Sequence, residues 1–240
     1  MKTTAVVMLV AAIAMRAPAA ELVVRQAQGD VSVRHGVTET WNAVKAGDLL
    51  KPDDTMRTGK GGTATVSLRD NDGRLRKSIS LPGEVIVEMS DVRDLTQEEL
   101  MLKLAMERVR SSPYRWKEGE LTIPNATVVH GTPPPASPVR EESDDGAGNL
   151  LLNGARALFA GGFYPTCALR TMDVLRRYPT LGADPENRLL AAEALERAGL
   201  RSEALTEYVS IAETEGLSPA MREKVDGRIA ALRKSDGSGR

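Results

Sequence analysis

The sequence has few of the residues that carry reactive chemistry or hold metals. It contains one cysteine and two histidines in 240 residues. This excludes a structural zinc site and a disulfide framework within one chain, because each needs several such side chains. Neither His35 nor His130 has a serine or cysteine nearby in a nucleophile motif, and no phosphate-binding glycine loop precedes a helix. We therefore expect a protein that is not an enzyme and that binds no cofactor or metal.

Aromatic residues and excess charge are also scarce. Aromatic residues make up 3% of the sequence, too few for a platform on which bases stack, and this scarcity also weakens the case for a sugar-binding cleft. The 32 basic and 33 acidic residues give a net charge of −1, whereas nucleic-acid-binding proteins normally carry a basic excess. We therefore expect no nucleic-acid partner. Hydrophobic residues are 41% of the chain, which favours folded cores, and its length favours two small domains.

No apolar run is long enough to anchor the chain in a membrane. The run at residues 5–15 is well below the roughly 20 residues that span a bilayer. It follows Lys2 and precedes the small residues Ala17 and Ala19, an order typical of a secretory signal peptide. We expect residues 1–19 to be removed on export, giving a periplasmic or secreted protein without a membrane span. A buried N-terminal helix is the alternative.

The first half of the chain shows the period of two and the frequent turn residues typical of short strands. The clearest strand is residues 63–68, in which apolar and polar side chains alternate. After a turn, a return strand is expected to direct Leu75, Ile79 and Leu81 inward. Short strands with many glycine turns indicate an all-β sandwich or roll.

Five short motifs follow one another in this β pattern. They are Gly29-Asp30-Val31, Gly47-Asp48-Leu49-Leu50, Arg57-Thr58-Gly59, Gly62-Thr63-Ala64 and Leu68-Arg69-Asp70 before Asp72-Gly73. In order and spacing they resemble the periplasmic domain of the FecR family. The resemblance implies a β-domain in a bacterial envelope setting, and in soluble relatives such domains are taken as binding or structural modules. The chain departs from the family's membrane-anchored anti-sigma members, so we do not expect sigma-regulating activity.

A capping box marks a helix after the β pattern. Thr96 and Glu99 are spaced so that each side chain bonds the other's backbone amide, and the helix is expected to run to about Arg110. Its apolar residues cover more than half of its circumference, which is more than a surface helix needs. We expect burial on more than one side within the chain, so that Leu102→Asp is destabilising. A methionine-rich groove for a partner is the alternative.

Two segments of different composition separate the β pattern from the C-terminal helices. Residues 91–123 are interpreted as this helix and an extension, and residues 124–148, rich in proline and acidic residues, as a solvated linker. A docking peptide for an aromatic groove is the alternative for the linker. The expected order is a signal peptide (1–19), a β-domain (20–90), the helix with its extension, the linker, and a helical domain (149–234).

Helical periodicity fills the last ninety residues and repeats. Helices are expected at residues 150–160, 166–177, 185–198, 202–215 and 219–234. Two helical hairpins carry residues that fit the same repeat pattern of small, large, glycine and aromatic positions. These are Ala155, Leu158, Gly162, Tyr164 and Cys167 in the first hairpin, and Ala192, Leu195, Gly199, Ala204 and Tyr208 in the second. At this spacing the region resembles a divergent pair of tetratricopeptide repeats, which have a period of about 34 residues, with a capping helix. Cys167 is expected to be a small buried core residue.

The tetratricopeptide resemblance implies a concave groove lined by the first helix of each repeat. The residues expected to face it are Asn149, Arg156, Phe159, Glu186, Glu193 and Arg197. Such grooves bind extended peptides or protein segments; solvated helix faces are the plainer alternative. We therefore expect a multidomain α+β protein that binds or scaffolds other proteins of the cell envelope. A peptidoglycan- or glycan-binding envelope protein is the alternative function.

Overall fold

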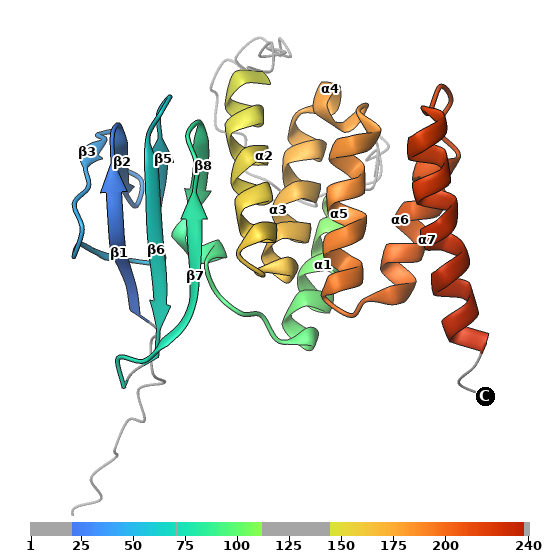
Figure 1. Ribbon diagram of the computed structural model, residues 1–240, viewed down its shortest axis with the longest axis horizontal. Coiled ribbons are helices and arrows are strands. Elements are labelled where there is room, and N and C mark those ends of the chain that lie inside the picture. The colour runs from blue at the N-terminus through green and yellow to red at the C-terminus, as the bar shows by residue number, and fades with distance from the viewer. Residues whose placement is uncertain (1–20, 71, 112–144, 238–240) are drawn as a thin grey trace, which may run out of the picture.

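The computed structural model describes residues 21–70, 72–111 and 145–237 (Figure 1). A two-sheet antiparallel β region comes first and a helical region follows, which confirms the expected α+β class. The expected signal peptide, at residues 1–19, and residues 124–144 of the expected linker lie outside the described residues.

Eight strands form two four-stranded antiparallel sheets. One sheet has the order β4-β1-β6-β7 and the other β3-β2-β5-β8, so β7 and β8 are edge strands. The strands are β1 (Glu21–Gln28), β2 (Val31–His35), β3 (Asn42–Ala43), β4 (Leu49–Leu50), β5 (Asp54–Thr58), β6 (Thr63–Arg69), β7 (Leu75–Leu81) and β8 (Val85–Glu88). The expected strand at residues 63–68 is confirmed as β6, with its apolar side chains buried.

The inward face expected on the return strand is confirmed except at its start. Ile79 and Leu81 of β7 are fully buried. The expectation for Leu75 is wrong, since 63% of its side chain is exposed. Leu75 lies beside the hairpin turn, where a register shift between Leu68 and Arg69 ends the regular pairing of β6 with β7. The alternation of apolar and polar residues in β7 therefore does not predict burial where its pairing with β6 becomes irregular.

The helical region contains all the α-helices of the described chain. They are α1 (Gln97–Ser111), α2 (Asp145–Ala160), α3 (Tyr164–Arg177), α4 (Pro179–Gly182), α5 (Pro185–Arg197), α6 (Arg201–Ala212) and α7 (Pro219–Gly237), and a 3-10 turn η1 (Met89–Asp91) follows β8. As expected, glycines end the helices at the hairpin turns, because Gly162 and Gly199 have positive φ angles of 77° and 84°. One half of the expected capping box is confirmed, since the Glu99 amide donates to Thr96 Oγ1 at 3.1 Å, whereas the Glu99 carboxylate pairs with Arg93.

One linker boundary has to be corrected. Residues 145–148, expected to be solvated linker, form the first turn of α2. They contact the short helix α4, which the sequence did not predict: Thr180 Oγ1 donates to Asp145 Oδ1 at 2.6 Å, and a Cβ at the buried Gly148 would lie 2.7 Å from Leu181 Cδ1. These contacts give tertiary partners to a stretch that has almost no apolar side chains of its own.

Helix α2 covers the edge of the β region. Figure 1 shows it lying beside β7 and β8, one edge strand of each sheet, with the other helices stacked beyond it. Gly154 makes the close approach possible, because a Cβ at this position would lie only 2.1 Å from the Ile86 carbonyl oxygen of β8. Covering β7 and β8 with a helix also protects these two edges from pairing with another chain.

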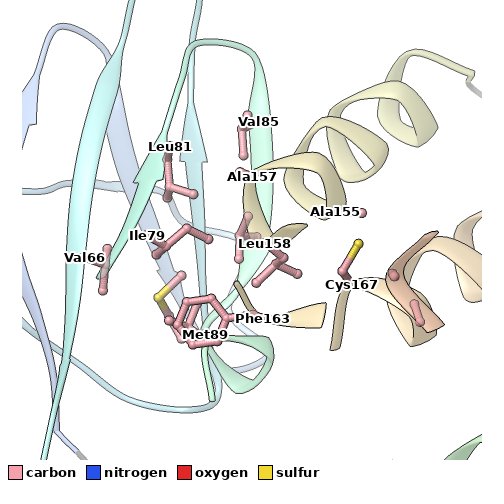
Figure 2. Packing of buried hydrophobic residues seen from close by; sticks show 14 of the residues in the cluster. Val66, Ile79, Leu81, Val85, Met89, Ala155, Ala157, Leu158, Phe163 and Cys167 are labelled. Carbon is pink, nitrogen blue, oxygen red and sulfur yellow. The ribbon is translucent and has the colours of Figure 1, made fainter. Parts of the chain in front are cut away.

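One hydrophobic core runs through both regions. The buried cluster extends from Leu22 in β1 to Leu232 in α7 without a break. At the junction, Ile79, Leu81, Val85 and Met89 of the β region meet Ala157, Leu158 and Phe163 of the helical region (Figure 2). Phe163, at the α2–α3 turn, is fully buried. The β region and the helices therefore pack as one body in the described chain.

Polar contacts tie the same junction together. Arg170 of α3 donates to Asp91 Oδ2 from Nε at 2.8 Å and to Glu88 Oε1 from Nη1 at 3.0 Å. The Asn153 amide of α2 donates to the Glu84 carbonyl at 3.0 Å. Lys77 of β7 lies 5.0 Å from the centre of the Phe163 ring. Residues about 70 to 90 positions apart are thus held in fixed geometry.

Helix α1 is buried on one side only, which corrects the expectation of burial on several sides. Leu100, Leu104 and Glu107 form its buried face, and the helix packs on α3. Leu102 is 63% exposed, so an aspartate there would stay in water. The apolar residues do cover a broad arc of α1, but in the described part of the chain the main helical neighbour of α1 is α3. The expected destabilisation by Leu102→Asp is therefore withdrawn.

Two leucines of α1, two positions apart, test this geometry. Leu104→Ala should lower the free energy of unfolding by about 2–4 kcal/mol, because Leu104 is 4% exposed and its removal leaves a cavity. Leu102→Ala should change it by less than about 0.5 kcal/mol. Urea denaturation of both variants measures the difference. Equal effects at the two positions would contradict the placement of α1.

Candidate functional site

A groove lies between the first helices of the two hairpins and the last helix. Its volume is about 440 Å³, within the range of about 300–1,000 Å³ typical of ligand sites. It is lined by Arg156 and Phe159 of α2, by Glu186, Leu189, Leu190 and Glu193 of α5, and by Met221 and Lys224 of α7. Four of the six residues expected from the sequence are therefore brought together here.

Helical spacing explains why these side chains share one groove. Glu186, Leu189, Leu190 and Glu193 are three or four positions apart on α5, so they lie on one face of the helix. Leu189 is buried, and Leu190 and Phe159 are partly buried against the core. The groove consequently has an apolar floor.

Charged side chains form the rim, and most of them are held in place. Arg156 donates to Asn153 Oδ1 and to Asn187 Oδ1, each at 2.8 Å. Lys224 Nζ lies 2.8 Å from Glu193 Oε1, which joins α7 to α5 across the groove. The Glu186 carboxylate makes no hydrogen bond or ion pair with the described part of the chain. The rim thus carries positive and negative side chains held in fixed positions, and the Glu186 carboxylate has no partner among the described residues.

Two of the expected residues lie elsewhere. Asn149 is two turns before Arg156 on α2, and it lines a separate hollow with Glu84 and Asn153. Arg197 is the last residue of α5 and lies 5.9 Å from the centre of the Tyr164 ring. Both positions have the right helical phase, but they lie too far along their helices to reach the groove.

Another hollow, larger than the groove, was missed by the sequence reasoning. It measures about 520 Å³ and lies between α1, α3, α5 and α6. The Glu107 carboxylate on its wall pairs with Arg176 Nε at 2.5 Å. Burial raises the pKa of Glu207, although Arg188 and Arg108 oppose that rise. The sequence could not reveal this hollow, because it depends on where α1 packs and α1 is not part of the repeat pattern.

The reactive residue types lie apart from the groove and from the hollow beside α1. His35 Nδ1 is 2.8 Å from Asp54 Oδ1 in the β region, and Cys167 is fully buried in α3 as expected. Within residues 21–70, 72–111 and 145–237, no three His, Cys, Asp or Glu side chains cluster so as to hold a metal ion. No helix in that same part of the chain has the length and apolar character needed to cross a membrane.

The Cys167 thiol should be inert in the folded protein. Burial raises its pKa to about 12, so almost no reactive thiolate exists at neutral pH. We expect Ellman's reagent to label no thiol at pH 8 until a denaturant is added, and then to label one per chain. Rapid labelling of the native protein would contradict the burial of α3 against its neighbours.

Comparisons with models of protein families, with curated proteins and with solved structures give no match to this chain.

Proposed function

We propose that the protein is an exported, non-catalytic module of the bacterial cell envelope that binds another protein in the groove between α2, α5 and α7. The observation that carries the proposal is the groove itself, in which Arg156, Phe159, Glu186 and Glu193 meet over an apolar floor. An extended protein segment fits this chemistry, because its alternate side chains can fill the floor and pair with the charged rim. The proposal places the protein in the periplasm or outside the cell.

The packing of the helices supports the tetratricopeptide-like interpretation. The small positions of that pattern, Ala155, Cys167, Ala192 and Ala204, are fully buried between helices. Large residues at these positions would push the helices apart. In such an arrangement the first helices line a concave surface, which agrees with the location of the groove.

The shared core supports a scaffolding role. A groove on helices that pack rigidly against the β region has a fixed orientation relative to that region. The FecR-like interpretation of the β region adds a second surface of the kind used in envelope binding modules. A partner held in the groove would therefore be positioned relative to whatever the β region contacts.

Site-specific photo-crosslinking in cells that express the protein tests the proposal. A benzophenone amino acid replaces Phe159 in the groove or, as a control, the fully exposed Val37 in the loop between β2 and β3. We expect one defined protein adduct from position 159 and not from position 37. Lys224→Glu, which reverses one rim charge, should reduce the adduct, whereas Lys60→Glu on a β-region turn should not.

The outcomes separate the alternatives. Adducts at position 159 that consist only of cell-wall glycan would support the glycan-binding function instead. The absence of any adduct at position 159, with the variant folded and exported, would contradict binding in this groove.

A further inference from the structure

The exposed face of α1 carries an apolar row. Leu102, Ala105 and Val109 follow one another at helical spacing on the side opposite the buried Leu100 and Leu104. The Leu102 and Val109 side chains are 63% and 75% exposed, and the half-exposed Met101 and Met106 widen the row. Soluble monomers seldom leave such contiguous apolar side chains uncovered, so the row indicates an interaction surface.

Opposite charges lie at the two ends of this row. Glu98 lies on the same line one turn before Leu102, and Arg108 and Arg110 flank Val109 at the other end. Glu98 and both arginines are exposed. Arg108 also borders the hollow between α1, α3, α5 and α6, where its charge opposes the rise in the pKa of Glu207, and Arg110 Nη1 is 3.6 Å from a Glu107 carboxylate oxygen. The row thus runs from an acid, through apolar side chains, to a pair of bases.

We propose that this row is the docking surface for a second copy of the chain, with the two α1 helices antiparallel. In that arrangement Glu98 of each copy lies beside Arg108 and Arg110 of the partner subunit, and two-fold symmetry repeats the contact at the other end. A parallel arrangement would align like charges. Opposing Glu98 with Val109 places Leu102 opposite Ala105, and the small alanine lets the helices approach closely.

We infer that a second copy binds here because the row is complementary to itself when two copies lie antiparallel. An unrelated protein would need the same acid–apolar–base order in reverse, whereas the chain already carries it. No residue of the row lines the groove between α2, α5 and α7. The dimer and the proposed function are therefore independent, and either can fail without the other.

The dimer should be weak and dependent on salt. One short helix pair buries less than the roughly 1,200–2,000 Å² of a standard interface, so we expect a Kd on the order of 100 µM. Ion pairs at its two ends are exposed, so raising the salt concentration from about 0.05 M to about 0.5 M should weaken it several-fold.

Sedimentation velocity of the mature chain, residues 20–240, over a concentration series tests the proposal. The wild type should pass from monomer to dimer as its concentration rises. Leu102→Asp should stay monomeric across the series, with the melting temperature of the wild-type monomer. Leu49→Asp is a matched control, because Leu49 is equally exposed but lies on a strand of the β region, and it should dimerise like the wild type.

Charge reversal tests the antiparallel geometry separately. Glu98→Arg and the double variant Arg108→Glu/Arg110→Glu should each dimerise at least about tenfold more weakly than the wild type at low salt. An equimolar mixture of the two should recover dimer, because both ends then carry opposite charges. Circular dichroism checks that each variant is folded.

A wild type that stays monomeric at about ten times the expected Kd would overturn the proposal. So would a dimer that persists unchanged in both Leu102→Asp and Glu98→Arg. Loss of the dimer in Glu98→Arg without recovery in the mixture would contradict the antiparallel arrangement.

Discussion

Gly154→Ala should lower the free energy of unfolding by about 3 kcal/mol, although alanine is normally the better helix residue. The added Cβ would lie 2.1 Å from the Ile86 carbonyl oxygen and 3.0 Å from Val87 Cγ2. The nearer atom belongs to the backbone of β8, so no side-chain rotation relieves the overlap. Helix α2 would have to move away from the edge strands, and the core at the junction would open.

Gly227→Ala is the matched control for this prediction. Gly227 also lies within a helix, α7, but a Cβ there meets no atom within 4 Å. The substitution should therefore stabilise the protein by about 0.5–1 kcal/mol through helix propensity alone. Chemical denaturation of both variants gives the two values. A stabilising effect at both positions would show that α2 does not pack closely on β8.

Arg170→Met should cost about 3 kcal/mol at pH 7.5, because it leaves two carboxylates at the junction without their counter-charge. Arg170 is 12% exposed, and its Nη2 atom lies 2.6 Å from Glu88 Oε2 and 2.7 Å from Asp91 Oδ2. Methionine keeps the apolar packing of the side chain. Arg177→Met, which removes an exposed arginine on the same helix, should cost less than about 1 kcal/mol.

The loss in Arg170→Met should be smaller at pH 5 than at pH 7.5. Burial raises the pKa of Asp91 from 3.8 to about 6, even though Arg170 opposes the rise. Because this folded-state pKa lies above the unfolded value, the folded state takes up a proton first as the pH falls through 6. Asp91 therefore favours folding at pH 5 and loses that contribution as the pH rises through 6. A larger loss at pH 5 than at pH 7.5 would contradict the burial of Asp91.

The local structure could be predicted from the sequence because it depends on neighbours along the chain. Alternation in residues 63–68 gave a strand, the Thr96–Glu99 spacing gave a helix start, and glycines gave the hairpin turns. The pattern also brought Arg156 and Glu193 to one groove, since helical phase is a local property. It failed for Asn149 and Arg197, because phase does not tell how far along a helix a groove extends.

The junction could not be predicted, because it depends on residues far apart in the chain. Arg170 meets Glu88 across 82 positions, and nothing local marks the pair. Gly154 could have been noticed in the sequence, because a glycine within a helix lowers the stability of the helix and therefore suggests a close contact. The sequence does not show which strand makes that contact. For α1, the positions of the apolar residues predicted a broad apolar arc. Only the packing of the helix on α3 shows which part of that arc is exposed.

The β region and the helices form one body through a shared core, which fixes the groove relative to the β region. Differential scanning calorimetry of residues 20–240 tests this cooperativity. We expect a single transition whose calorimetric enthalpy equals its van't Hoff enthalpy, as for one cooperative unit. Two separate transitions, one for the β region and one for the helices, would contradict it.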